Sequence, residues 1–459
     1  MQELTCFKTY DIRGRVGVDL DPAIAKRIGR AFCEVLAARR VVVGRDCRES
    51  SGPLAEALIE GLLESGAEVL DIGLAGTEEM YHATHHFGAD GGIEVTASHN
   101  PIDYNGMKLV GPHATPIDPD RTLGAVRRLA ESGEFAAPQR GGVRRDATHA
   151  RAAYVQTVMK FVDPAALRPL TILVNSGNGV AGPAFDAVAV ELEAHGAPLR
   201  FVRMHHDPDG SFPNGIPNPL LPENQPITAN AVRAHGADMG VAWDGDFDRC
   251  FFFDADGQFI DGEYILGLLA AVFLEKHPGE QIVHDPRVVL NTLDVVAKAG
   301  GRAVLSATGH VFIKQKMRET GAVYGGEMSA HHYFRDFAYC DSGMIPWLLV
   351  AELMGRSGTS LADLVADRRA RFPSSGEINF RLSDPVAAMA AVRAAYAPGA
   401  LMVEDMDGMS LTFEDWRFNL RASNTEPVVR LNVEAKGNAA RVAEGVAGIR
   451  SVLAGFAAP

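Results

Sequence analysis

Hydrophobic and polar positions follow one cycle that occurs at three places along the chain. Each cycle has an apolar run readable as a buried strand, a polar loop, an amphipathic helix, one or two glycines and a second strand. The first strands begin near 41–44, 170–175 and 281–284. The expected helices and second strands cover 53–65 and 68–72, 183–194 and 199–202, and 292–299 and 303–305. Strands separated by helices of this length are typical of parallel α/β units, and these copies are too widely spaced for a solenoid. The pattern therefore predicts three related α/β domains.

The pattern changes from about residue 366 onward. A short strand follows Phe372-Pro373, and further strands are expected near 400–404, 409–413, 416–421 and 428–434, with helices at 385–396 and 438–453. Clustered strands flanked by helices favour a separate α+β domain with an antiparallel sheet. We therefore expect domains at 1–150, 151–250, 251–365 and 366–459.

Composition and charge narrow the class of protein. The chain has 459 residues, 47% of them hydrophobic and 22% charged, which is ordinary for a soluble globular protein. The net charge of −14 argues against nucleic acid or an anionic membrane as partner. The five cysteines form no C-x-x-C pair, so neither a disulfide framework nor a zinc site is expected. No run is long enough to span a membrane and no signal-peptide pattern is present, so we expect a cytoplasmic protein.

The first candidate for chemistry is a polar loop at 96–101, Thr-Ala-Ser-His-Asn-Pro, which follows a strand at 92–95. The proline stops the strand, so Ser98 is expected at a loop tip beyond the strand's carboxyl end, where open α/β sheets place their chemistry. His99 is adjacent and Lys108 follows shortly. A hydroxyl, an imidazole and an amine this close together suggest an activated serine. The alternative is a polar surface turn.

The second candidate is an acidic triplet after the apolar strand 239–243. Asp244, Asp246 and Asp248 occupy alternate positions of an extended segment, so their carboxylates point to one side. Their convergence is unfavourable unless a cation neutralises them, and oxygen-only ligands indicate Mg²⁺ or Ca²⁺. An EF-hand is rejected because Arg249 stands where its glycine is required. A solvated acidic turn is the alternative.

Other polar loops are less specific by themselves. The loop 325–332, Gly-Gly-Glu-Met-Ser-Ala-His-His, suits a polyol ligand, and 308–310, Thr-Gly-His, offers a further polar tip. The segment 421–427, Arg-Ala-Ser-Asn-Thr-Glu-Pro, is either a phosphate cradle or an Asx or Ser/Thr turn. Arg13 before Gly14 is either a phosphate contact or part of a plain turn.

A rival function comes from Gly177–Gly182, which matches G-x-G-x-x-G between a strand and a helix. This context fits a dinucleotide site and hence an NAD-dependent oxidoreductase. The acidic partner is poorly placed, because Met204, His205 and His206 precede Asp207 after the second strand. Glycines that close a tight strand-to-helix turn are an equally good interpretation.

Taken together, T-A-S-H-N-P, D-G-D-x-D-R, G-E-M-S and R-x-S-N-T-E-P resemble the α-D-phosphohexomutase superfamily, most of all its bacterial phosphomannomutases, in order and over the whole chain. The resemblance implies an α/β protein with three related α/β domains of mixed sheets and a C-terminal α+β domain around a central cleft. It implies interconversion of mannose 6-phosphate and mannose 1-phosphate, through a phosphoserine enzyme and a hexose 1,6-bisphosphate, for GDP-mannose and polysaccharide synthesis. A phosphoglucomutase or a dual-specificity enzyme is the alternative. A sugar-phosphate-binding protein without catalysis would lack Ser98 or the acidic triplet.

The resemblance also implies roles for individual residues. Ser98 would carry the phosphoryl group, and Asp244, Asp246 and Asp248 would hold Mg²⁺ together with an oxygen on Ser98. Lys108 resembles the acid/base candidate, and the other catalytic candidates are Tyr10, Arg13, His99, Arg249 and His331. The residues expected to bind substrate are Arg287, Thr308, Gly309, His310, Glu327, Ser329, Arg421, Ser423, Asn424 and Thr425. A hexose 1,6-bisphosphate would prime the enzyme, and a small hexose phosphate is the expected partner.

Overall fold

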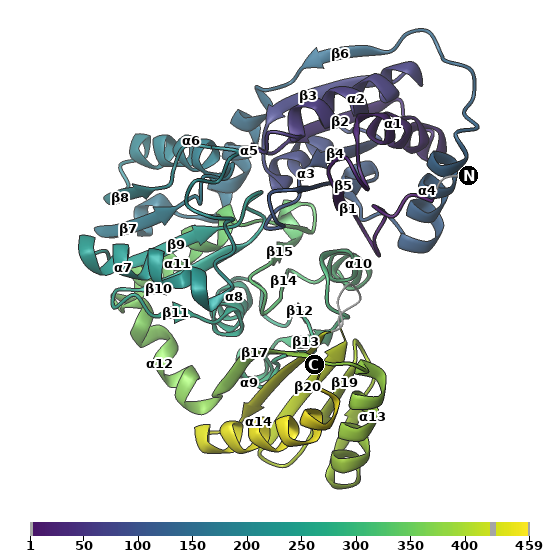
Figure 1. Ribbon diagram of the computed structural model, residues 1–459. Coiled ribbons are helices and arrows are strands. Elements are labelled where there is room, and N and C mark those ends of the chain that lie inside the picture. The colour runs from purple at the N-terminus through teal and green to yellow at the C-terminus, as the bar shows by residue number, and fades with distance from the viewer. Residues whose placement is uncertain (1–2, 423–427, 458–459) are drawn as a thin grey trace. The chain divides into compact units, whose positions relative to one another are not determined.

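The computed structural model describes residues 3–422 and 428–457. By internal contacts the chain forms two compact units (Figure 1). The first unit runs to Phe259 and also includes His331–Gly358. The second unit comprises Ile260–Ala330 and the chain from Thr359 onward.

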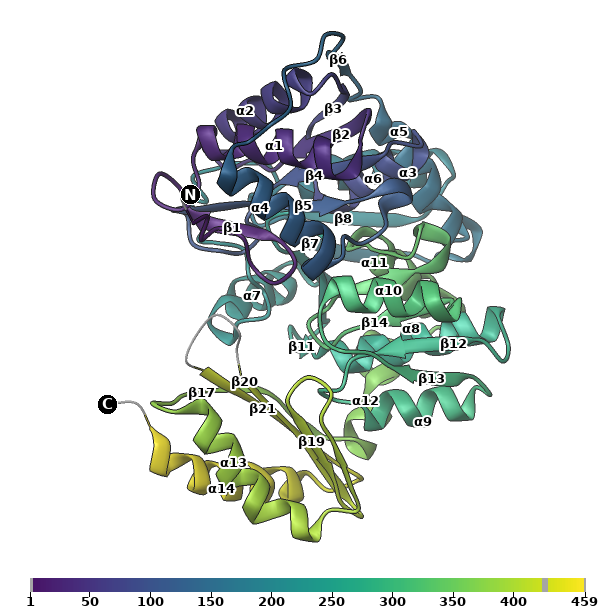
Figure 2. The same ribbon diagram turned by 90° about the vertical axis from the view of Figure 1, so that its right-hand side faces the viewer.

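The first unit begins with a mixed six-stranded sheet of order β1-β5-β4-β2-β3-β6. Its strands are β1 (Ile12–Arg15), β2 (Arg40–Arg45), β3 (Glu68–Leu74), β4 (Gly91–Val95), β5 (Tyr104–Val110) and β6 (Val143–Asp146). Its helices are α1 (Pro22–Leu36), α2 (Ser51–Glu64), α3 (Thr77–His86) and α4 (Gly124–Ser132). Strands β2, β3, β4 and β6 are parallel, whereas β5 is antiparallel to both of its neighbours. Helices α1 and α2 pack together and bury their apolar faces in one core (Figure 2).

A second sheet of the first unit has the order β10-β9-β7-β8. Its strands are β7 (Leu170–Asn175), β8 (Leu199–Met204), β9 (Met239–Trp243) and β10 (Cys250–Asp254), and β11 (Phe259–Ile260) follows at the end of this stretch. The helices are α5 (Ala150–Val158), α6 (Ala181–Ala194) and α7 (Gln225–His235). The returning segment adds β15 (His332–Phe334), β16 (Cys340–Asp341) and α11 (Met344–Ser357). This segment belongs to the first unit because the ring of Trp347 packs 5.6 Å from that of Phe185 on α6, and Trp243 donates its indole N–H to the carbonyl of Gly343.

The second unit contains a parallel group of order β13-β12-β14 and a separate antiparallel sheet. The parallel group has β12 (Gln281–His284), β13 (Arg302–Leu305) and β14 (Tyr324–Gly326), with helices α8 (Gly262–Lys276), α9 (Leu290–Lys298), α10 (His310–Thr320) and α12 (Leu361–Arg371). The antiparallel sheet has the order β17-β21-β20-β19-β18. Its strands are β17 (Ser374–Arg381), β18 (Met402–Glu404), β19 (Met409–Thr412), β20 (Trp416–Ala422) and β21 (Val428–Ala435).

Helices α13 (Pro385–Tyr396) and α14 (Ala439–Leu453) lie side by side against the antiparallel sheet (Figure 2). Trp416, Phe418, Leu431 and Ile449 are among the buried residues of this core. The predicted C-terminal α+β arrangement is therefore confirmed, and the repeated α/β cycle appears as β2-α2-β3, β7-α6-β8 and β12-α9-β13.

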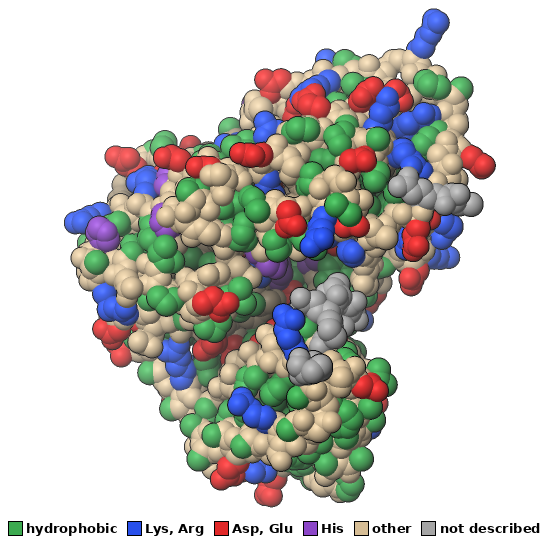
Figure 3. Space-filling model, viewed as in Figure 1, with side chains coloured by type: hydrophobic (Ala, Val, Ile, Leu, Met, Phe, Trp, Pro, Cys, Tyr) green, Lys and Arg blue, Asp and Glu red, His purple; other side chains and the backbone are tan. Residues whose placement is uncertain are grey.

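Charged side chains of both signs lie on the surface (Figure 3), as the 22% of charged residues leads one to expect. Acidic and basic side chains are interspersed over the face shown in Figure 3, without a large area of one sign. Across residues 3–422 and 428–457, no helix is both long and apolar enough to cross a membrane.

Candidate active site

The loop after β4 and the loop after β9 meet at Ser98. The Ser98 hydroxyl donates to Oδ2 of Asp244 at 2.6 Å and lies 3.0 Å from Nδ1 of His99. Ser98 is only 2% exposed, and its φ of 49° lies in the left-handed region. A Cβ on Gly245 would lie 2.5 Å from the Ser98 carbonyl oxygen, so the close approach of the two loops requires glycine there. The sequence prediction that Ser98 lies at a loop beyond a strand's carboxyl end agrees with this placement.

The acidic triplet forms a buried cluster of oxygen atoms. One carboxylate oxygen from each of Asp244, Asp246 and Asp248 lies within 4.8 Å of the others. Oδ2 of Asp246 accepts from the Thr77 hydroxyl at 2.6 Å and from the Lys108 amine at 2.7 Å, and Lys108 also donates to Asp248. Oδ1 of Asp246 is buried and has no hydrogen-bond partner within the described residues. Because buried carboxylate oxygens are seldom left without a partner, the cluster fits a hard divalent cation.

Burial and neighbouring charges shift the pKa values of the ionisable groups in the cluster. Burial opposes the charge of Lys108, but Asp246 and Asp248 outweigh burial and raise the pKa of its amine. Arg249 outweighs burial at Asp244 and holds the pKa of that carboxyl well below its usual range. Burial and the neighbouring charge of Asp246 raise the pKa of Asp248 to about 7. Lys108 and Arg249 already lie against the three carboxylates, so the support for a further cation is the oxygen-only donor set and Oδ1 of Asp246, which has no partner within the described chain.

His99 is held as a neutral imidazole. Burial and the charge of Arg249 lower the pKa of His99 to about 4. The guanidinium of Arg249 donates to Nδ1 of His99 as well as to Asp244. Nδ1 is thus an acceptor at neutral pH, and the Ser98 hydroxyl is left to donate to Asp244.

Three further predicted catalytic residues, Arg13, Tyr10 and His331, belong to the first unit. Arg13 on β1 donates to Oδ1 of Asn100 at 2.6 Å and to Asp11 at 3.0 Å, which ties β1 to the serine loop. Tyr10 is half-buried just before β1. His331 makes an isolated antiparallel bridge with Arg249, and its Nε2 lies 3.7 Å from Asp248. The structure therefore brings all seven predicted catalytic residues into the first unit.

In the second unit, Arg287 contacts Glu327 and Ser329 of the loop that is predicted to bind a polyol. Its guanidinium lies 3.1 Å from Oγ of Ser329 and 3.4 Å from Oε1 of Glu327. The same Glu327 oxygen accepts from the backbone N–H of Gly309 at 2.9 Å. Thr308 and His310 flank that glycine, whose φ of 119° suits only glycine. The predicted residues 308–310 and 327–329 are thus brought together with Arg287.

A cationic cluster surrounds Glu377 on β17. Arg421 on β20 donates to Oε2 of Glu377 at 3.2 Å, and Arg287 and Arg430 each lie 3.8 Å from its carboxylate. Arg421 and Arg430 are also directly opposite in the register of β20 and β21. Other carboxylates also lie at these guanidinium groups, Asp285 beside Arg287 and Asp407 at 4.0 Å from Arg421. The support for an anion site is therefore the facing pair Arg421 and Arg430, because like charges directly opposite on a sheet are otherwise destabilising. Ser423, Asn424 and Thr425 lie outside the described residues.

Sequence reasoning missed Thr77, Arg430 and Glu377. For Arg430 a signal existed, because Arg421 and Arg430 lie on the consecutive predicted strands 416–421 and 428–434, and an antiparallel register can place them opposite each other. For Thr77 the sequence contains no such signal, because Thr77 is 169 residues from its partner Asp246 and only the tertiary fold brings the two together.

The Gly177–Gly182 loop is explained by packing. The N–H of Val180 donates to the Gly245 carbonyl at 3.1 Å, and a Cβ on Gly179 would lie 2.6 Å from that same oxygen. The N–H of Asn178 donates to His205 at 2.8 Å. These amides are used within the protein, and the glycines let this loop contact the acidic loop.

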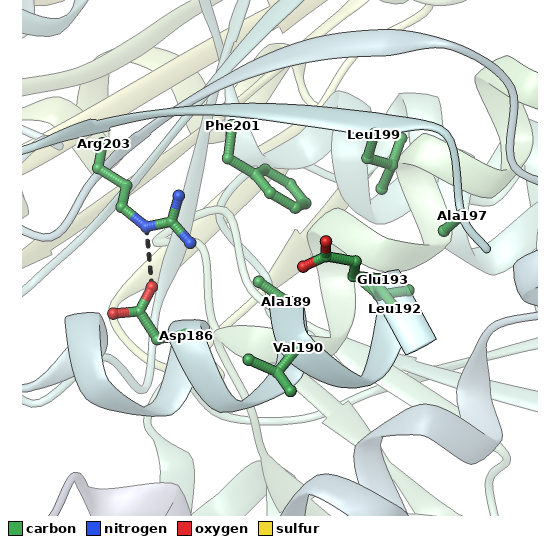
Figure 4. A pocket seen from close by; sticks show the side chains of 9 residues that line it. All are labelled: Asp186, Ala189, Val190, Leu192, Glu193, Ala197, Leu199, Phe201 and Arg203. Atoms are coloured by element: carbon green, nitrogen blue, oxygen red, sulfur yellow. Dashed lines mark hydrogen bonds and ion pairs between the residues drawn. The ribbon is translucent and has the colours of Figure 1, made fainter. Parts of the chain in front are cut away.

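A surface pocket between α6 and β8 contains none of the predicted residues. Asp186 and Arg203 form an ion pair of 2.8 Å at one end, and Phe201 lies beside it (Figure 4). The remaining lining is largely aliphatic and lacks a cluster of polar groups. The pocket is therefore not part of the candidate site.

The phosphoglucomutase/phosphomannomutase family matches the chain in four consecutive stretches. Its alpha/beta/alpha domains I, II and III match residues 4–136, 152–257 and 261–372, and its C-terminal domain matches 377–452.

Relatives match over nearly their whole length. A phosphomannomutase of Salmonella montevideo is 60% identical, with 95% of this chain and 96% of the relative covered. Phosphohexose mutases of Xanthomonas campestris pv. campestris (strain ATCC 33913) are 54% identical, with 98% and 100% covered. The crystal structure of a phosphoglucomutase/phosphomannomutase family protein from Burkholderia thailandensis is 34% identical and covers 99% of this chain and 98% of its own, with a TM-score of 0.87. The chain therefore belongs to the phosphoglucomutase/phosphomannomutase family of the phosphohexomutases, as its four motifs indicated.

Proposed function

We propose that the protein is a phosphomannomutase that interconverts mannose 6-phosphate and mannose 1-phosphate through phosphorylated Ser98 and a hexose 1,6-bisphosphate. Relatives that are named phosphomannomutase and are 53–60% identical over nearly the whole chain support this proposal. The observation that carries it is the contact of the Ser98 hydroxyl with the acidic cluster, at 2.6 Å from Asp244. Phosphoryl transfer depends on positioning and charge neutralisation. This contact supports the positioning of Ser98, and the neutralisation would come from cations at the cluster.

Lys108 and Arg13 are the cationic side chains that we assign to the phosphoryl group on Ser98. Lys108 is protonated at neutral pH because two carboxylates hold its charge. Its charge can therefore neutralise the phosphoryl oxygens. From its resemblance to the acid/base residue of the family, we also assign to Lys108 the proton that Oγ of Ser98 takes up as its bond to phosphorus breaks. Arg249 holds His99 neutral beside the serine, and Tyr10 and His331 complete the proposed surroundings of the reacting oxygens.

Asp244, Asp246 and Asp248 are the residues that would hold Mg²⁺, together with an oxygen on Ser98. The support is the oxygen-only donor set and the buried Oδ1 of Asp246 without a partner in the described chain. When bound, Mg²⁺ supplies neutralisation of the charge on the transferred phosphoryl group.

Residues of the second unit would bind the substrate itself. Glu327 and Ser329 offer acceptor and donor groups for sugar hydroxyls, beside Arg287 and residues 308–310. The cluster around Glu377 would take the phosphate that does not react, with Arg421 as its main contact and Arg430 as an added one. The predicted Ser423, Asn424 and Thr425 complete this proposed phosphate site.

Mannose phosphates are the proposed preferred substrates, and glucose phosphates are the second candidate because the matched family includes both kinds of mutase. The two sugars differ only at carbon 2, so a loop that reads the 3- and 4-hydroxyls accepts both. Contacts at carbon 2, which we assign to the segment 330–332, then give modest discrimination of about 10–200-fold.

The borders of four domains, near residues 150, 250 and 365, are part of the same proposal. So is a cytoplasmic place of action, since phosphorylated sugars are produced and used there. Mannose 1-phosphate made in this way would supply GDP-mannose and polysaccharide synthesis.

The test is a comparison of kcat/KM for the 1-phosphates of mannose, glucose and glucosamine, with a hexose 1,6-bisphosphate added to prime Ser98. We expect mannose phosphate to be the best substrate, glucose phosphate to be measurable, and Ser98→Ala to be inactive on both. Glucosamine phosphate as the best substrate would overturn the proposal.

A further inference from the structure

We propose that Arg48 is the positioning residue that fixes the backbone of Ser98 for phosphoryl transfer. This inference rests on the proposed function of Ser98 as phosphoryl carrier. Arg48 lies between β2 and α2 and is 2% exposed. Within the described residues, its side-chain hydrogen bonds go to the backbone of residues 98–104 and to none of the residues proposed to bind substrate.

The guanidinium of Arg48 binds the serine loop through four backbone carbonyl groups. Nη2 donates to the carbonyl oxygens of Ser98 at 2.9 Å and Asn100 at 2.7 Å. Nη1 donates to those of Pro101 at 3.0 Å and Tyr104 at 3.2 Å. One planar side chain therefore holds the loop at four points from Ser98 to Tyr104. A lysine cannot do this, because its amine lacks the planar arrangement of donors of a guanidinium.

The loop needs this support because Ser98 has a φ of 49°. The left-handed conformation is unfavourable for a residue with a Cβ, and it persists only where the surroundings enforce it. The bond from Arg48 fixes the carbonyl of Ser98 on one side, and the contact with Gly245 limits it on the other. The side chain of Ser98 is thereby directed to Asp244.

Arg48 is itself held by its neighbours. Oδ2 of Asp46 lies 3.6 Å from Nε of Arg48 as an ion pair, and the ring of Phe212 lies 5.3 Å from the guanidinium carbon. Oδ1 of Asp46 accepts from the backbone N–H of Arg48 at 3.0 Å. Asp46 also accepts from the hydroxyl of Ser51 on α2. These contacts orient the guanidinium of Arg48 before any substrate binds. A residue that positions another group needs such support.

The consequence is a specific kinetic signature. A misplacement of about 1 Å at a reacting atom costs on the order of 10²-fold in rate, whereas substrate binding relies on other residues. We expect Arg48→Lys and Arg48→Met to lower kcat by ~10²-fold with KM within ~3-fold of the wild type. Phosphorylation of Ser98 by hexose 1,6-bisphosphate in a single turnover should slow by the same factor.

The experiment compares these two variants with Arg368→Met. Arg368 donates to Asn291 and Asp294 in the second unit, so its loss removes a comparable arginine network away from Ser98. We expect near wild-type kcat for Arg368→Met, and faster amide exchange in residues 96–104 only in the Arg48 variants.

Two results would overturn the inference: an Arg48→Lys enzyme with kcat within ~3-fold of the wild type, or a loss that lies in KM alone. If the Arg48 variants do not fold, Asp46→Asn provides the test. This variant keeps the guanidinium of Arg48 but removes the charge that pairs with it, and we expect ~10-fold lower kcat. Unchanged kcat in that variant would also overturn the inference. A wild-type enzyme without any mutase activity would instead refute the proposed function.

Discussion

The substitution Thr77→Val removes one hydroxyl and tests whether that hydroxyl orients the Asp246 carboxylate for the proposed Mg²⁺. Thr77 begins α3, and its hydroxyl donates to Oδ2 of Asp246 at 2.6 Å. That bond, together with the one from Lys108, uses Oδ2 and leaves Oδ1 without a partner in the described chain. Valine has nearly the same shape as threonine but cannot donate, so the carboxylate loses part of its orientation.

The expected magnitude follows from the kind of bond that is lost. A hydrogen bond to a charged group contributes about 1.5–3 kcal/mol, and each 1.4 kcal/mol is about tenfold. Groups that orient a metal ligand typically account for about 10–100-fold in metal affinity or activity. We therefore expect Thr77→Val to weaken Mg²⁺ activation by about 10–100-fold, while kcat recovers in part at saturating Mg²⁺.

The assay is mutase activity titrated with Mg²⁺, with Thr84→Val as the matched control. Thr84 is also buried on α3, but its hydroxyl donates to the carbonyl of Met80. Thr77→Ser keeps the donor and should restore most of the affinity. If Thr77→Val needs no more Mg²⁺ than Thr84→Val does, the hydroxyl does not orient Asp246 for the metal and the reasoning is wrong.

Three further predictions test the other parts of the account. Asp246→Asn removes a proposed metal ligand and should lower kcat by about 10²-fold or more, as excess chelator should in the wild type; full activity in either case would exclude the metal. Arg421→Ala should raise KM by about 10–150-fold through loss of a charge-assisted contact, with Arg441→Ala as a control on the same domain; equal KM values would exclude the phosphate site. Burial raises the pKa of Glu78 to about 8, so stability is full below its unfolded pKa of about 4.3 and is lost as pH rises towards 8. Glu78→Gln should flatten this decline in chemical denaturation by at most about 1.4 kcal/mol per pKa unit, and an unchanged slope would show that Glu78 does not cause it.

Local patterns were enough to predict the three α/β cycles and the C-terminal strands with their two helices. The apolar run 239–243 is β9, and the expected helix 385–396 is α13. Periodicity predicts such elements because a buried strand or an amphipathic helix is defined by residues adjacent in sequence. The triplet after β9 was predictable for the same reason, since alternate residues of an extended segment share one side.

Contacts between distant segments could not be predicted in this way. The pairing of Lys108 with Asp246 requires the fold to bring β5 to the loop after β9, and Arg48 reaches the serine loop from a different strand end. No periodic pattern or characteristic spacing of residues in the sequence indicates either contact. The sequence motifs therefore indicated the loops to which we assign the chemistry, and the structure adds residues that contact those loops.

The most direct test of the central claim is the mass of the intact protein after incubation with a hexose 1,6-bisphosphate, followed by peptide mapping. The account predicts a species heavier by one phosphoryl group, located on Ser98, which disappears when excess mannose 6-phosphate is added and is absent from Ser98→Ala. An enzyme that interconverts mannose phosphates while Ser98 never carries a phosphoryl group would contradict the account.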